Sequence, residues 1–215
     1  MPSRIDHSLL PVSPDFSFEA ALWERGIRYI AGVDEVGRGA LAGPVAAAAV
    51  VLPAGAAAAA ELMGIKDSKQ LAAGQREKWS ASIRNIALGW EVGLASSAEI
   101  DGIGIVPATQ LAMRRAISRL RVRVEYVLID YLHLPDIAIP QESLVKGDER
   151  SISIASASIL AKVARDAILC DLDSQYPGYG FAQNKGYGTQ VHRIALSKQG
   201  LSPVHRRCFQ VKSPL

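Results

Sequence analysis

The residues best suited to chemistry in this sequence are two adjacent carboxylates, Asp34 and Glu35. They close an apolar run that begins at Tyr29, and three glycines, an arginine and a proline follow within nine residues. A charge at the end of a buried strand is costly unless it is paired or binds a metal ion. Glycine permits the sharp turn that would keep two adjacent side chains in one place. We therefore expect a functional site in this stretch.

Three interpretations of the stretch remain open from its residues alone. The first is a metal-binding acid pair followed by a glycine-rich backbone clamp for a polyanion. The second is a dinucleotide-binding fingerprint, since Gly37, Gly39 and Ala42 fit G-x-G-x-x-A after a strand. That fingerprint should open a helix, whereas the segment VAAAAVVL that follows favours a second strand of a hairpin. Glu61, near the spacing of a ribose-binding acid, follows an alanine-rich loop rather than a strand. The third is a tight turn with two solvated acids.

Two later extended segments also end in an acid. EYVLID ends at Asp130, and a short segment through Leu144 ends at Lys146-Gly147-Asp148. If these segments neighbour the first strand in one sheet, four carboxylates converge at one edge, which is too repulsive to persist without cations. Ligands that are all oxygen favour magnesium or manganese over zinc. Two such ions can clamp the attacking and leaving oxygens of a phosphodiester, so the pattern predicts metal-assisted phosphodiester hydrolysis.

The remaining elements are expected to position these acids. Apolar periodicity and capping residues predict helices and strands in alternation. The expected helices are 18–25, a segment after Asp67-Ser68-Lys69 with Leu71, Trp79 and Ile83 on its apolar positions, 107–120, a long serine-rich one over 151–176, and a short one near the end. The expected strands are 29–35, 45–52, 89–95, 125–130 and the short segment through 144–145, with residues 96–100 as a loop. The serine-rich helix start lacks bulky side chains and is expected to pack closely under the site.

Composition bounds the class of protein. The 215 residues are 49% hydrophobic and 21% charged, with a formal net charge of +3, as in a compact globular protein. The segment from Lys185 to the end carries lysines and arginines but no acid, which suits a polyanionic substrate or simple solubility. Cys170 and Cys208 form no disulfide framework. Without a signal-like start or a long uncharged apolar window, we expect a soluble, cytoplasmic protein.

Several longer motifs resemble those of a known family and follow one another in the same order along the chain. They are GVDEVGRG-x-LAGPV, the DSK segment, PATQLAMRRA, VLID, KGDERSISIASASILAKVARD, YPGYGF-x-x-NKGYGT-x-x-H and HRR-x-F. From about Tyr29 to Phe209 the sequence is similar to ribonuclease HII, the bacterial type 2 ribonuclease H. The resemblance implies an α/β fold with a ribonuclease H-like mixed central sheet flanked by helices and a small helical C-terminal segment. We expect an arm and lead-in helix over 1–26, a catalytic domain over 27–180 and a substrate-binding segment over 181–215.

The resemblance also implies roles for individual residues. The family's four catalytic carboxylates match Asp34, Glu35, Asp130 and Asp148. These residues would hold two divalent ions, Mg²⁺ or Mn²⁺, with Asp34 as the bridging ligand. Its clamp for the ribonucleotide 2′-hydroxyl, the group that distinguishes RNA from DNA, matches Gly37, Arg38 and Gly39. Its tyrosine, which stacks on the sugar of the next deoxynucleotide, matches Tyr187. Candidates for phosphate contacts are Lys69, Lys146 and Lys185. The acid in KVARD, Asp166, is expected to pair with a nearby arginine rather than with metal.

The activity that the resemblance implies is hydrolysis of RNA in RNA/DNA hybrids and cleavage 5′ to single ribonucleotides in duplex DNA, in ribonucleotide excision repair. We expect a monomer whose partner is the nucleic acid. The alternatives are a non-catalytic hybrid-binding protein and, more remotely, an NAD-dependent oxidoreductase. His192 and His205 match family positions but are expected to be structural. The sequence departs from the family's usual pattern at Ala40, Tyr131 and Asn184.

Overall fold

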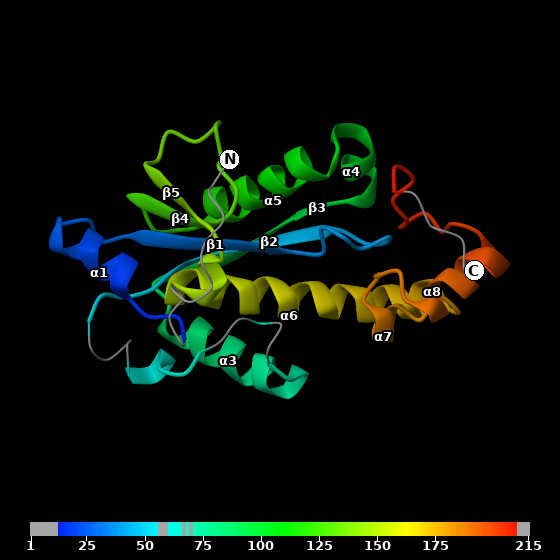
Figure 1. The fold of residues 1–215 in the computed structure, drawn as a ribbon, viewed down its shortest axis with the longest axis horizontal. Coiled ribbons are helices and arrows are strands. Elements are labelled where there is room, and N and C mark those ends of the chain that lie inside the picture. Colours follow the sequence, from blue (N-terminus) through cyan, green and yellow to red (C-terminus); the bar gives the residue numbers. More distant parts are fainter. Residues whose placement is uncertain (1–12, 56–59, 66–67, 69–70, 210–215) are drawn as a thin grey trace.

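The protein is organised around a five-stranded mixed sheet (Figure 1). The computed structural model describes residues 13–55, 60–65, 68 and 71–209. The strand order is β3-β2-β1-β4-β5, so the first strand is central. The strands are β1 (Ile30–Val36), β2 (Val45–Val51), β3 (Gly89–Ala95), β4 (Tyr126–Asp130) and β5 (Gln141–Leu144). The expected α/β class with a mixed sheet flanked by helices is confirmed.

The pairing of the strands places two acids side by side. The strand β1 pairs with β2 in an antiparallel hairpin, as expected, and with β4 in parallel. In the parallel pair Val33 lies opposite Ile129, so the next residue on each strand is an acid, Asp34 and Asp130. Because parallel strands end at the same edge of a sheet, both carboxylates reach one edge.

Helices cover both faces of the sheet (Figure 1). One face carries α4 (Ser97–Ile103) and α5 (Ile105–Arg119), and its core includes Val33, Met113 and Ile129. The other carries α6 (Ile152–Gln175), with α3 (Ala73–Ile86) packed outside it. Shorter helices include α1 (Ser17–Glu24), α7 (Phe181–Asn184) and α8 (Gln190–Gln199).

The helix α6 approaches β1 unusually closely. A Cβ atom placed on Gly32 would lie 2.2 Å from the main-chain carbon of Ser153. The first turns of α6 carry small buried residues such as Ser153, Ala155 and Ala157. The expectation of close packing under the site is confirmed, and it places the first half of α6 directly beside the acid at position 34.

Two expectations about local structure were wrong. Residues 96–100, expected as a loop, enter α4, because Ser96 accepts a hydrogen bond from the Glu99 amide while the Glu99 carboxylate accepts one from the Ser96 amide. The acid at position 148 does not end a strand. The strand β5 stops at Leu144, and Asp148 lies in the short helix η3 (Gly147–Glu149), beyond Lys146 in the left-handed conformation.

Among the described residues, no helix is long and apolar enough to cross a membrane.

Candidate active site

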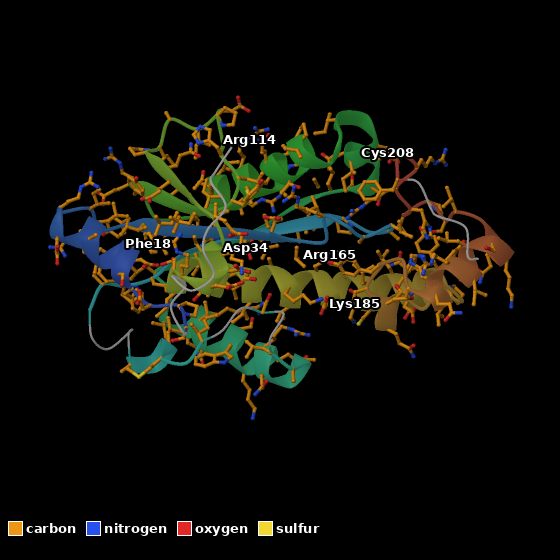
Figure 2. All side chains as sticks on the ribbon, in the orientation of Figure 1. Phe18, Asp34, Arg114, Arg165, Lys185 and Cys208 are labelled. Atoms are coloured by element: carbon orange, nitrogen blue, oxygen red, sulfur yellow. The ribbon has the colours of Figure 1, made fainter. Side chains whose placement is uncertain are left out.

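Three carboxylates gather at the edge formed by the ends of β1 and β4. One oxygen from each of Asp34, Glu35 and Asp130 lies within 4.8 Å of the others. Asp34 is only 3% exposed, whereas the other two are half-buried. Figure 2 shows Asp34 between the sheet and α6. Strand register thus brings together acids that are far apart in the sequence.

Asp148 reaches the same neighbourhood through a turn. Lys146 has a φ of 55°, and the Gly147 amide donates a hydrogen bond of 2.7 Å to Asp130 Oδ1. A Cβ atom on Gly147 would lie 2.6 Å from Ile154 Cδ1, so a larger residue there would require the Ile154 side chain to move. Asp148 is buried, and its charge acts on Asp34, although it is not one of the three acids grouped within 4.8 Å.

The electrostatics of the cluster favour a bound cation. Burial raises the pKa of Asp34 well above its ordinary value, and the charges of Glu35, Asp130 and Asp148 raise it further. A hydrogen bond from Ser158 on α6 opposes this rise. Crowded carboxylates in a desolvated place are stabilised by a cation, and a donor set of oxygens alone fits Mg²⁺ or Mn²⁺. The residues present therefore fit the divalent ions that the sequence predicts.

The glycine-rich loop that follows β1 turns directly beside these acids. Gly37 has a φ of +92°, a conformation that favours glycine, and Arg38 donates a hydrogen bond of 3.2 Å to Glu35 Oε1. A Cβ atom on Gly37 would lie 2.1 Å from Arg165 Nε, whereas one on Gly39 would meet nothing within 4 Å. The loop's backbone is thus held near the carboxylates.

Two buried arginines, which the sequence analysis did not assign to the site, support this loop. The residues Arg165 and Arg206 are 0% and 1% exposed. Arg206 donates to the Arg38 carbonyl at 2.8 Å and twice to the Gly43 carbonyl. Burial, followed by the charge of Arg165, lowers the pKa of Arg206 to about 10, which leaves that guanidinium charged at neutral pH. Burial also lowers the pKa of Arg165, but an arginine side chain is not deprotonated in proteins. Two cations behind the loop favour an anionic ligand in front of it.

A second loop, which carries Tyr187, docks on the first by its backbone. The amide of Leu41 donates to the Gly186 carbonyl at 2.8 Å. Gly186 has a φ of +79°, and a Cβ atom there would lie 2.4 Å from the Ala42 carbonyl oxygen. Asn184, a departure from the family pattern, is buried and closes this loop by accepting from the Gly186 amide and donating to the Tyr179 carbonyl. Asn184 therefore has a structural role.

A buried pair of histidines holds the same loop from behind. Since a carbonyl can only accept, His192 Nδ1 donates to the Tyr187 carbonyl, at 2.9 Å. The Ser202 amide donates to His205 Nδ1, so His205 Nε2 carries the proton and donates to His192 Nε2 at 3.0 Å. Both nitrogens that would take up a further proton already accept hydrogen bonds. His192 and His205 are thus structural, as expected.

This pair predicts that the protein loses stability in mild acid. Burial, with the charge of His192, lowers the pKa of His205 from 6.5 to about 4, and burial lowers that of His192. The unfolded state then binds more protons between these pH values, so stability present above pH 6.5 falls as the pH drops toward 4, by about 3 kcal/mol for His205. Urea unfolding at several pH values should show that the free energy of unfolding depends less steeply on pH in His205→Gln than in the parent protein. The exposed-histidine variant His133→Gln should keep the parent's slope, and an equal slope in all three proteins would refute the assignment.

The lysine candidates and the remaining acid lie as follows. Lys146 Nζ donates to Glu149, at 3.0 Å, and Lys185, with a φ of 51°, places Nζ 3.0 Å from Cys170 Sγ. Lys69 lies outside the described residues. Asp166 pairs with Lys162 at 2.8 Å and lies 3.9 Å from Arg76, which accounts for it without a metal ion. Tyr131 is half exposed and left-handed, with a φ of 57°.

Comparison with known proteins identifies the family. The ribonuclease HII family model matches residues 31–212. The chain belongs to the ribonuclease HII family. Ribonuclease HII of Desulfitobacterium hafniense (strain DSM 10664 / DCB-2) is 53% identical over 191 residues, which is 89% of this chain and 72% of that protein. Ribonuclease HII of Synechococcus sp. (strain JA-3-3Ab) is 53% identical over 92% of this chain and 89% of its own length.

Solved structures agree with this membership. Ribonuclease HII from Archaeoglobus fulgidus, solved in complex with PCNA, superposes with a TM-score of 0.71 at 25% identity, over 87% of this chain and 98% of that one. Bst-RNase HIII, solved in complex with Mn²⁺, gives a TM-score of 0.61 at 21% identity, over 80% of this chain and 63% of that one, a likeness of fold alone. The protein is therefore an endoribonuclease with ribonuclease H activity on RNA/DNA hybrids.

Proposed function

We propose that this ribonuclease HII cuts 5′ to single ribonucleotides embedded in duplex DNA, as well as within RNA/DNA hybrids, and leaves 3′-hydroxyl and 5′-phosphate ends. The observation that carries the proposal is the joint placement of the carboxylate cluster and the Gly37–Gly39 turn. Arg38 in that turn bonds to Glu35 in the cluster. A group that recognises a ribose beside the reacting phosphate would be held at a fixed distance from it.

Asp34, Glu35, Asp130 and Asp148 would hold two divalent ions, Mg²⁺ or Mn²⁺. When bound, such ions activate a water molecule and stabilise the leaving oxygen of the phosphodiester. The buried position of Asp34 and the charges around it support its role as a ligand that would hold these ions. The cluster itself repels a phosphodiester, so cleavage should require added metal.

The substrate-reading residues would lie on the two docked loops. The main chain at Gly37, Arg38 and Gly39 would contact the 2′-hydroxyl, which DNA lacks. The ring of Tyr187 would stack on the sugar of the following deoxynucleotide. Lys146, Lys185 and Lys69 remain candidates for contacts to the flanking phosphates. We propose that the protein works as a cytoplasmic monomer in ribonucleotide repair.

The test is cleavage of a labelled DNA duplex that carries one ribonucleotide. With Mg²⁺ or Mn²⁺, we expect one cut on the 5′ side of that ribonucleotide, cleavage of an RNA/DNA hybrid, and no cut in an all-DNA duplex. Chelation should stop all cleavage. A protein that binds the duplex but leaves it intact with either metal would instead be a hybrid-binding protein. Cleavage of the hybrid alone would remove the embedded ribonucleotide from the proposal.

A further inference from the structure

The guanidinium of Arg165 lies where the two substrate-facing loops meet. The arginine is part of α6, is fully buried, and is labelled between α6 and the sheet in Figure 2. Its Nε donates to the Pro44 carbonyl at 2.9 Å and its Nη2 to the Ala42 carbonyl at 3.2 Å. Its Nη1 donates to the Lys185 carbonyl at 2.8 Å. One side chain thus ties the end of the glycine-rich loop to the loop that carries Tyr187.

The shape of the surroundings fits this one side chain. The space that a side chain on Gly37 would occupy is filled by Arg165 Nε, 2.1 Å from the would-be Cβ atom. The Arg165 Cζ atom lies 5.5 Å from the centre of the Tyr187 ring, within reach of a cation–π contact. Lys185 holds a left-handed backbone conformation, and its carbonyl is fixed by Arg165. A strained backbone of this kind persists only where its surroundings hold it.

A planar guanidinium suits this position better than any other cation. Its donors form a rigid fork that can reach three carbonyl oxygens at once, whereas a lysine ammonium is a point charge on a flexible chain. For the described residues, every hydrogen bond of the Arg165 guanidinium goes to a main-chain carbonyl. Its role is therefore to fix backbone positions rather than to neutralise an acid.

We propose that Arg165 is a positioning residue that sets the spacing between the 2′-hydroxyl-reading turn at Gly37–Gly39 and the ring of Tyr187. This inference rests on the proposed function and adds to it a side chain that, together with the backbone bonds between Leu41 and Gly186, holds the two loops together. Because both loops are docked, the ribose and the next sugar are read one nucleotide apart at a fixed distance. A substrate with a ribonucleotide followed by a deoxynucleotide needs both readings, while the interior of a long RNA strand needs only the first.

The test compares two substrates for each protein. In Arg165→Lys, kcat/KM for a duplex with one ribonucleotide should fall by about 10-fold or more, and cuts in a substrate with four consecutive ribonucleotides should spread away from the RNA-to-DNA junction. Cleavage of a long RNA/DNA hybrid should fall far less. The matched control is Arg115→Lys, because Arg115 on α5 donates to the Leu94 carbonyl and to Glu99, outside both loops. It should keep the parent's preference.

Each outcome decides a different point. An equal loss on both substrates, or an unchanged junction preference in folded Arg165→Lys, would overturn the positioning role. Should that variant not fold, Gly186→Ala separates the same loops, because its Cβ atom would meet the Ala42 carbonyl at 2.4 Å, and the same loss of preference is expected. An unchanged preference in folded Gly186→Ala would likewise overturn the role. A parent protein that fails to cut the single-ribonucleotide duplex refutes the proposed function itself, whatever the variants do.

Discussion

Asp34→Asn is expected to lower cleavage of every substrate by about 1,000-fold or more while leaving substrate binding little changed. The carboxylate at position 34 is the buried centre of the cluster, and an uncharged amide there would weaken the hold on any divalent ion. Cleavage rates in Mg²⁺ and in Mn²⁺, together with the dissociation constant for a ribonucleotide-containing duplex, test both parts. Parent-like turnover would remove Asp34 from the reaction.

The same variant should be more stable than the parent when no metal is present. Burial and three neighbouring carboxylates raise the pKa of Asp34, so at neutral pH its ionised form destabilises the fold. We expect the melting temperature in chelator to rise by about 2 °C or more in Asp34→Asn. Added Mg²⁺ or Mn²⁺ should stabilise the parent more than the variant and so reverse or narrow the difference.

Asp166→Asn is the matched control for both measurements. Asp166 is the carboxylate in α6 that pairs with Lys162 and lies near Arg76, and it is not among the three acids grouped at the ends of β1 and β4. Its loss should keep cleavage within about threefold of the parent and should not produce the metal-dependent change in melting temperature. Equal loss of activity in both variants would mean that the acids of the cluster have no special role.

Gly32→Ala is expected to destabilise the protein by about 3 kcal/mol or more. The added methyl group would lie 2.2 Å from the main-chain carbon and 2.4 Å from the carbonyl oxygen of Ser153. A backbone cannot rotate away as a side chain can, so α6 must move off β1. Urea unfolding measures the loss. Activity should fall as well, because the moving helix carries Ser158 and Arg165.

Gly102→Ala provides the contrast. Gly102 lies in α4, and a Cβ atom there meets nothing within 4 Å, so alanine should leave the stability unchanged or raise it by up to about 1 kcal/mol. A similar loss in both variants would show that the effect of Gly32→Ala is a general cost of substitution. A neutral Gly32→Ala would show that α6 can shift without cost.

Strands were predictable from the sequence because apolar runs with clear ends define them. The span 89–95 was predicted to the residue, and β1, β2 and β4 fall within one residue of their predicted limits at both ends. The helix α4 was missed, although Ser96 and Glu99 carried the spacing of a capping box. The sequence could not reveal that β1 lies between β2 and β4, because strand order depends on contacts far along the chain. The sequence therefore predicted that the acids converge only on the condition that these strands are neighbours in one sheet.

The two buried arginines could not be found by the same reasoning. Arginine is expected at the surface or opposite an acid, yet Arg165 and Arg206 are buried against carbonyl oxygens of a loop more than a hundred residues earlier in the chain. Those carbonyl oxygens face the two arginines only after the loop that follows β1 has folded. Asp148 lies near the other acids, as the sequence predicts, but in a short helix rather than at the end of a strand. The left-handed conformation before this helix is held by Lys146, and a lysine does not signal such a turn in a sequence.

The parallel pairing of β1 with β4 also affects the order in which parts of the active site fold while the chain is being synthesised. Ile30 pairs with Tyr126, so the central strand waits for a partner made much later, while its hairpin with β2 can form early. Non-local pairing of this kind slows folding, because the chain must close a long loop first. The Tyr187 loop leaves the ribosome later still. A nascent chain would therefore bring its carboxylate cluster together before the loop that carries Tyr187 could fold, and nuclease activity would be the last property to appear.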